Sequence, residues 1–117
     1  MEISGSTVLL TGATGGIGHA IARALSAKGA DLILTGRRVD ILEPLSSELG
    51  ARSLAVDLSE PTEVDRLLSE AGELDILVAN AALPGSGPLD SFTVEQIDRA
   101  LDVNLRAPIA MTHALAP

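Results

Sequence analysis

The sequence predicts an α/β protein whose parallel, doubly wound sheet is covered by helices on both faces. Short apolar runs alternate with helix-like patterns along the 117 residues. This alternation is typical of a parallel sheet, because each crossover between parallel strands needs a helix-sized connection. A glycine-rich turn, Thr11–Gly18, follows the first apolar run and precedes the first helical pattern. These observations predict a three-layer α/β/α domain with a functional turn at the edge of its sheet.

Four apolar runs are the expected strands: Val8–Leu10, Leu32–Leu34, Leu54–Val56 and Asp75–Ala79. Crossovers between parallel strands are right-handed in nearly all proteins. The strands should therefore lie in the order 3-2-1-4, which is the first half of a doubly wound sheet.

The first expected helix lies between the first two strands and ends at Gly29. Six residues recur at helical spacing in it: Ile17, Ala20, Ile21, Ala24, Leu25 and Lys28. We expect this stripe to face the sheet.

Two further crossover helices repeat the pattern. Val39–Leu49 ends at Gly50, and Pro61–Ala71 ends at Gly72. Ser59 is the expected N-cap of the second of these helices.

The chain after the fourth strand begins with a long loop, Asn80–Ser91, whose length suggests a functional role. A helix should start at Thr93, because Thr93 and Gln96 match a capping box. Phe92 and Ile97 occupy the positions of a hydrophobic staple, which gives the only aromatic residue a structural role.

A last helical pattern runs from about Asn104 to Leu115. Pro108 is tolerable only in the first turn of that helix.

Composition limits the possible partners. A formal net charge of −8 argues against a nucleic-acid or anionic-membrane partner, since both require a basic surface. The absence of cysteine excludes disulfides and thiolate metal sites. His19 and His113 lack acidic neighbours at metal-ligand spacing, so we interpret them as surface or helix-packing residues and predict no metal site. With no signal segment or long apolar run in evidence, we expect one soluble, cytoplasmic domain over residues 1–117.

The glycine turn is the candidate phosphate site. A strand that ends in glycines allows a tight turn, and the first amides of the next helix then point at one spot that attracts phosphate. The spacing of Gly12, Gly16 and Gly18 differs from the Gly-x-Gly-x-x-Gly dinucleotide fingerprint. Taken alone, the same residues are also compatible with a flexible loop.

Arg37 and Arg38 follow the second strand, where enzymes that prefer the non-phosphorylated dinucleotide usually carry an acid. Two arginines face the unfavourable end of the next helix dipole, which an anion such as a 2′-phosphate between them would offset. The alternative is a solvated pair near Asp40 or Glu43.

Two polar residues end the third and fourth strands. Asp57 could accept a hydrogen bond from an adenine amino group, or it could start the turn towards Ser59 and Pro61. Asn80 could contact a ligand or satisfy neighbouring backbone groups.

Four motifs in register resemble the short-chain dehydrogenase/reductase family over essentially the whole chain. They are Thr11-Gly12-x-x-x-Gly16-Ile17-Gly18, Asp57-Leu58, Asn80-Ala81 and Val103-Asn104-Leu105. The resemblance implies a Rossmann sheet that binds NAD(P) and an oxidoreductase that transfers a hydride between nicotinamide and an alcohol or carbonyl substrate.

The resemblance also implies roles for particular residues. Gly12, Gly16, Ile17 and Gly18 would surround the pyrophosphate, Asp57 and Leu58 the adenine, and Asn80 and Ala81 the nicotinamide ribose. Arg37, with Thr14 near the same ribose and no acid at Gly36, implies that NADP(H) is preferred, although NAD(H) is possible. Asn104 matches the asparagine of the catalytic tetrad, which holds a water in a proton relay.

The sequence departs from the family pattern at two places. The usual Asn-Asn-Ala-Gly reads Ala79–Ala82 here, which leaves the geometry near the nicotinamide open. The family's Tyr-x-x-x-Lys is missing, since the chain has no tyrosine and its single lysine is Lys28. We therefore expect a truncated N-terminal half that is inactive alone, with the substrate undetermined.

Two other hypotheses stay open. The chain could be a non-catalytic module that senses NADP(H) or pairs with a partner, because half a sheet leaves the Asp75–Ala79 strand as an apolar edge. It could also bind a mononucleotide or flavin, which leaves Arg37 and Asn104 unexplained. In the family, the helices around Thr93–Val103 and after Asn104 form the main subunit contact, so the resemblance implies a homodimer or homotetramer.

Overall fold

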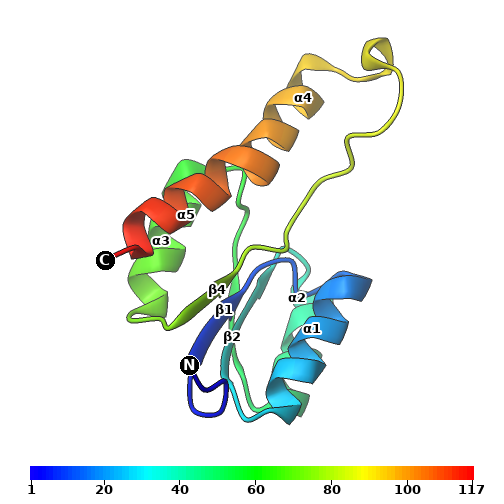
Figure 1. The fold of residues 1–117 in the computed structure, drawn as a ribbon. Coiled ribbons are helices and arrows are strands. Elements are labelled where there is room, and N and C mark those ends of the chain that lie inside the picture. Colours follow the sequence, from blue (N-terminus) through cyan, green and yellow to red (C-terminus); the bar gives the residue numbers. More distant parts are fainter.

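The computed structural model describes all residues from Met1 to Pro117. Strands and helices alternate through the first two thirds of the chain, and a long loop followed by helices makes up the last third (Figure 1). The elements are β1 (Thr7–Leu10), α1 (Gly16–Ala27), β2 (Asp31–Gly36), α2 (Val39–Leu49), β3 (Arg52–Ala55), α3 (Pro61–Ala71), β4 (Ile76–Val78), α4 (Val94–Leu101) and α5 (Ala107–Leu115). A 3₁₀ turn (Leu89–Ser91) precedes α4, and a π-helical turn (Asp102–Arg106) joins α4 to α5.

The sheet has the predicted topology. Its four strands are all parallel and lie in the order β3-β2-β1-β4. Leu10 at the end of β1 pairs with Leu34 of β2 and Val78 of β4, so the carboxyl ends of the strands meet at one edge. In a doubly wound sheet this edge is where ligands bind.

Helices cover both faces of the sheet, which confirms the three-layer α/β/α architecture (Figure 1). Strand residues alternate between the faces: Val8 and Leu10 pack in the core beneath α1 and α2, while Leu9 packs in the core beneath α3 and α5. All three side chains are completely buried, as befits strands covered on both sides.

The sheet-facing side of α1 agrees only in part with the predicted stripe, of which Ile21 and Leu25 pack against the core. Gly18 and Ala22 are the buried residues of α1, while Ile17 is 73% exposed. The reason is a close approach: a Cβ at position 18 would overlap the carbonyl oxygen of Gly12, so only glycine can pack there. The helix is therefore rotated with Gly18 against the glycine turn, and Ile17 borders the cavity described below.

The predicted N-cap of α3 is wrong, whereas the capping box of α4 is confirmed. Glu60 is the N-cap residue of α3, because Ser59 directs its amide and hydroxyl back to Asp57. At α4, the Thr93 hydroxyl accepts from the Gln96 amide, and the Gln96 side chain accepts from the Thr93 amide.

The final helical segment also departs from the prediction. Asn104 does not begin a helix but lies in the π turn that makes Val94–Leu115 one continuous helical run. Pro108, the second residue of α5, has no N–H to donate to the carbonyl of Asn104, four residues earlier. The π turn accommodates the proline without breaking the helix.

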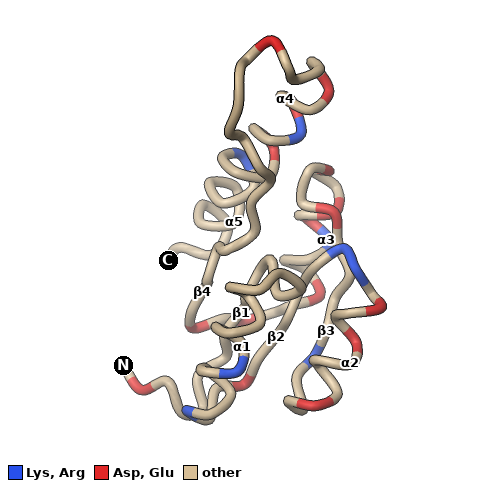
Figure 2. The backbone as a smooth tube through the Cα atoms, turned by 90° about the vertical axis from the view of Figure 1, so that its right-hand side faces the viewer, with Lys and Arg blue, Asp and Glu red and all other residues tan.

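Acidic residues are spread over the helices and loops, while basic residues are fewer (Figure 2). The longest basic stretch in this view connects β2 to α2, where Arg37 and Arg38 adjoin. No helix of the structure combines the length and apolar character needed to cross a bilayer.

Candidate functional site

A cavity of about 430 Å³ opens at the carboxyl edge of the sheet. The residues predicted from the sequence to bind a cofactor all lie in its lining, contributed by four separate segments of the chain. They are Gly12, Thr14, Gly16, Ile17, Gly18, Arg37, Asp57, Leu58, Asn80 and Ala81. Tertiary structure thus brings together motifs that lie up to about 70 positions apart in the sequence.

Close backbone packing shapes the glycine turn. Gly12 has φ +68°, and a Cβ there would lie 2.8 Å from the Cα of Ala81. A Cβ at Gly16 would meet nothing within 4 Å, so space is open beside this residue. The turn needs glycine at positions 12 and 18 for its own packing, while Gly16 keeps space free next to the cavity.

The amino terminus of α1 points unpaired donors at this space. The Gly15 N-cap has no side chain to cap the helix, and His19 is the first residue of α1 whose amide is bonded, to the Gly15 carbonyl. The amides of Gly16, Ile17 and Gly18 have no hydrogen-bond partner within the chain. Free amides at the positive end of a helix dipole form an anion site.

The two neighbouring arginines have different surroundings. Arg38 forms an ion pair with Asp40 at 2.9 Å, which is the solvated arrangement considered above. Arg37 has no ion pair or hydrogen bond and lines the cavity. An unpaired cation at the cavity of a chain with net charge −8 adds a second anion-binding feature.

Asp57 starts a turn, one of the two roles considered for it, and it also borders the cavity. Its Oδ1 accepts hydrogen bonds from the Ser59 amide at 3.0 Å and the Ser59 hydroxyl at 2.7 Å, so it starts the turn into α3. It also lines the cavity, and its Oδ2 lies 3.5 Å from the Arg99 guanidinium. Burial raises the Asp57 pKa, but the Ser59 hydrogen bonds and the charges of Arg99 and Arg37 outweigh burial and leave the pKa below its ordinary value.

Asn80 satisfies backbone groups while it borders the cavity. Its side-chain amide donates to the Gly12 carbonyl at 3.2 Å. The buried Thr11 hydroxyl accepts from the backbone amides of both Asn80 and Ala81, at 3.1 and 3.0 Å. These contacts fasten the end of β4 to the glycine turn, so the two walls of the cavity are held together.

Asn104 lies beside the cavity rather than in its lining. Its Oδ1 accepts from the Leu83 amide at 2.7 Å, and its Nδ2 donates to the Leu83 carbonyl at 2.9 Å. The side chain is therefore engaged in holding the loop after β4. The Asn104 backbone carbonyl, in contrast, lacks its usual α-helical donor because Pro108 has no N–H.

Sequence reasoning missed several residues at this site. Thr35, Val56, Ala82, Leu83 and Val103 also line the cavity. Val103 sits directly before Asn104, and the other four sit within two positions of a predicted residue or strand end, so adjacency was the available signal. Arg99, which contacts Asp57 and Ser59, lay on an expected helix and carried no such signal.

The lining offers groups that could hold a dinucleotide. Free amides at α1 suit a pyrophosphate, Arg37 suits a further phosphate, and the apolar Val56 and Leu58 suit a base next to Asp57. No three His, Asp or Glu side chains of the chain lie close enough together to hold a metal ion. His19 and His113 both lie outside this cavity lining.

Comparison with known proteins places these features in a family. The model of the short chain dehydrogenase family matches residues 6–117. Nodulation protein G of Rhizobium sp. (strain N33) is 42% identical over 120 residues, covering 97% of this chain and 49% of that protein. Human L-xylulose reductase is 37% identical over 115 residues, covering 97% of this chain and 47% of that protein.

A solved structure agrees with the sequence matches. The short-chain dehydrogenase from Sphingobium yanoikuyae in complex with NADPH superposes with a TM-score of 0.87 at 33% identity, covering 96% of this chain and 48% of that one. The chain spans about half the length of the curated relatives it matches.

Proposed function

This chain belongs to the short chain dehydrogenase family, and we propose that it supplies the cofactor-binding half of an NADP(H)-dependent oxidoreductase. The proposed reaction transfers a hydride between the nicotinamide and an alcohol or carbonyl substrate. One observation carries the proposal: the free amides of α1 and the unpaired Arg37 line the same cavity.

Two features support NADP(H) over NAD(H). Arg37 offers a fixed positive charge, and guanidinium groups bind phosphate oxygens in a bidentate fashion. Gly36 brings no acid to the end of β2, and a Cβ there would lie 2.7 Å from Cγ2 of Thr14. Thr14 therefore occupies the space that an acidic side chain at position 36 would enter. The NADPH bound by the Sphingobium yanoikuyae enzyme gives further support.

The residues of this chain would bind and orient the cofactor. The amides of Gly16–Gly18 would hold the pyrophosphate, Asp57 and Leu58 would contact the adenine, and Asn80 and Ala81 would border the nicotinamide ribose. The cofactor, when bound, supplies or accepts the hydride. Asn104 would contribute its backbone carbonyl to a water in the proton relay, since its side chain is occupied by Leu83.

The proton-transfer base of the proposed reaction would come from residues outside Met1–Pro117. The chain has no tyrosine, and Lys28 is exposed at the carboxyl end of α1, away from the cavity. We expect no turnover from residues 1–117 alone. The alternative, a non-catalytic NADP(H)-binding module, predicts the same cofactor binding, so it differs only in whether the complete protein reduces carbonyl substrates.

Calorimetric titration with NADPH and NADH tests the cofactor proposal. We expect tighter binding of NADPH, and Arg37→Ala should weaken NADPH binding by about tenfold or more while leaving NADH binding little changed. Arg38→Ala is the matched control, because Arg38 is already paired with Asp40 and should leave the preference intact. Equal binding of the two cofactors would contradict the NADP(H) preference, and no binding to the folded chain would contradict the site.

We also propose that the protein forms a homodimer or homotetramer through α4 and α5. Leu101, Leu105 and Ile109 are 54%, 57% and 60% exposed and recur every four residues on one face of this helical run. Together they border a groove against α3, and a second copy would cover them. Light scattering should report a dimer or larger, and Leu105→Glu should produce a monomer; a wild-type monomer at high concentration would contradict the proposal.

A further inference from the structure

Arg99 is the residue through which α4 reaches the cavity wall. No residue of α4 is buried, and the helix extends beyond the sheet (Figure 1). Arg99 nevertheless turns towards the β3–α3 connection, where its Nη1 donates to the Ser59 hydroxyl at 3.1 Å and approaches Asp57 Oδ2 at 3.5 Å. None of the site roles proposed above uses this contact.

The contact completes a chain of polar groups that ends at the cavity. The Ser59 hydroxyl donates to Asp57 Oδ1 and accepts from Arg99, so both of its hydrogen-bonding functions are used. The Asp57 carboxylate is thus held by Ser59 on one oxygen and by Arg99 near the other. A carboxylate has about four acceptor positions, so Asp57 retains capacity for a donor in the cavity.

Charged groups from three elements face this carboxylate. Arg99 from α4 and Arg37 from the β2–α2 connection favour its ionised form, and Glu63 of α3 is a like charge nearby. These groups favour an ionised Asp57 held in one orientation, and an ionised carboxylate can only accept hydrogen bonds.

The same helical run also contributes to the cavity lining through a second stretch. Val103 lines the cavity and Asn104 holds Leu83, only five residues after Arg99. In a regular α-helix, adjacent residues point about 100° apart. Val103 and Asn104 both lie in the π turn, which departs from this regular spacing.

We propose that Arg99 is a positioning residue for the adenine end of the cofactor, which it controls by holding Asp57 and Ser59. The helical run that carries Asn104 thereby contacts residues of the cavity lining in two places. This inference rests on the proposed function, in which Asp57 accepts a hydrogen bond from the adenine amino group.

The test compares NADP⁺ with its hypoxanthine analogue, in which an oxo group replaces the adenine amino group. Wild-type protein should bind NADP⁺ about fivefold more tightly than the analogue. Arg99→Gln should reduce this ratio towards one. Without Arg99, the Asp57 carboxylate is no longer held in place and should distinguish less well between the amino and oxo groups of the two ligands. A purely structural role would weaken both ligands equally and leave the ratio unchanged.

Three variants make the comparison specific. Arg99→Lys should recover part of the ratio, since an ammonium group can still donate to Ser59. Arg23→Gln is the matched control: it removes the bidentate pair with Glu48 between α1 and α2, outside the cavity, and should keep the wild-type ratio. Ser59→Ala removes the shared hydroxyl and carries the same test if Arg99→Gln fails to fold.

Each outcome separates this inference from the proposed function. Wild-type protein that binds neither ligand overturns the proposed function. Wild-type protein that binds both equally overturns the role of Asp57 and Arg99 but leaves the cofactor site standing. A ratio in Arg99→Gln equal to that of wild type overturns the inference alone.

A carboxyl ¹³C NMR titration of Asp57 without nucleotide provides an independent check. Loss of the Arg99 charge should raise the Asp57 pKa from its depressed value. An unchanged pKa would show that Arg99 does not reach the carboxylate in solution.

Discussion

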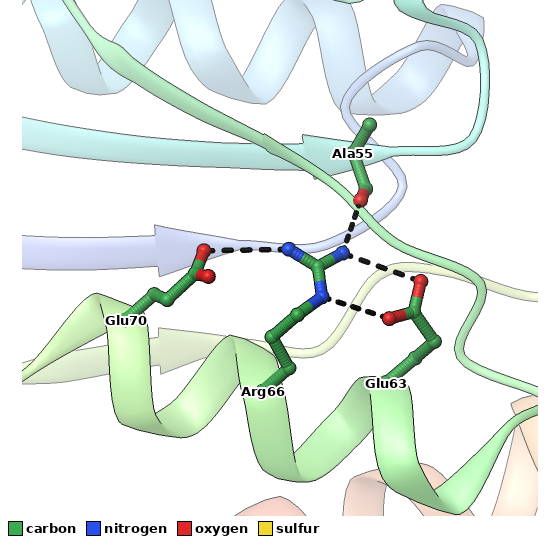
Figure 3. Close-up of polar contacts among 4 residues, drawn as sticks. All are labelled: Ala55, Glu63, Arg66 and Glu70. Atoms are coloured by element: carbon green, nitrogen blue, oxygen red, sulfur yellow. Dashed lines mark hydrogen bonds and ion pairs between the residues drawn. The ribbon is translucent and has the colours of Figure 1, made fainter.

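Arg66 and Arg37 lie near the carboxyl ends of neighbouring strands but have opposite surroundings. Arg66 of α3 donates twice to Glu63, at 2.8 and 3.2 Å, once to Glu70 at 3.3 Å and once to the Ala55 carbonyl at 2.7 Å (Figure 3). Arg37 makes none of these contacts and faces a cavity instead. The first region satisfies its charges internally, whereas the second leaves a charge available for a ligand.

The contrast between the paired Arg66 and the unpaired Arg37 distinguishes polar groups that stabilise the fold from polar groups that are available to a ligand. The guanidinium of Arg66 fastens α3 to the last residue of the edge strand β3, where an unsatisfied carbonyl would invite pairing with another chain. The unpaired amides of Gly16–Gly18 and the unpaired Arg37 gather at a single cavity. Unsatisfied donors of both kinds in one place indicate a site for an anionic ligand.

The largest effect is expected from breaking the close packing of the glycine turn, which lines the cavity. Gly18→Ala should destabilise the fold by about 2–3 kcal/mol and abolish NADPH binding, because its Cβ would overlap the Gly12 carbonyl and push α1 away from the turn. Urea unfolding and calorimetry measure the two effects.

Gly16→Ala is the matched control for that change. Its Cβ meets no atom within 4 Å, so stability should change by less than about 0.5 kcal/mol. Any loss of NADPH binding in this variant then reports on the space beside the amides rather than on the fold. Equal destabilisation by both alanines would contradict the packing argument.

A smaller effect is expected from the contact that holds the loop after β4 to the π turn. Asn104→Ala removes both hydrogen bonds to Leu83 and should cost about 1 kcal/mol. Hydrogen exchange at the Leu83 amide should accelerate, while the amides of β1 keep their protection. Unchanged exchange at Leu83 would show that other contacts hold this loop.

The smallest effect should come from Arg66, whose guanidinium already has partners within the chain. Arg66→Ala should lower the thermal midpoint by a few degrees at most, because its ion pairs are partly solvent-exposed. The ratio of NADPH to NADH affinity should equal that of wild type, in contrast to Arg37→Ala. A changed ratio in Arg66→Ala would break the distinction between the two arginines.

Much of the candidate site could be predicted from short motifs. Gly12, Asp57 and Asn80 each follow an apolar strand, and a parallel sheet brings such positions to one edge. The contact between Arg99 and Asp57 could not be predicted, because it joins residues 42 positions apart through a side chain on an exposed helix. Ser59 was misassigned because its hydroxyl had two possible uses, and the proximity of Arg99 favours the one that faces Asp57.

The sequence by itself determined the strand order, the crossover helices and the glycine turn, because these follow from hydrophobic periodicity, the handedness of crossovers and the conformational freedom of glycine. Tertiary structure decided the packing of Gly12 against Ala81, the contact between Asn104 and Leu83 and the pairing of Arg99 with Asp57. Those features depend on contacts between segments that are distant along the chain, and local sequence patterns carry no record of such contacts.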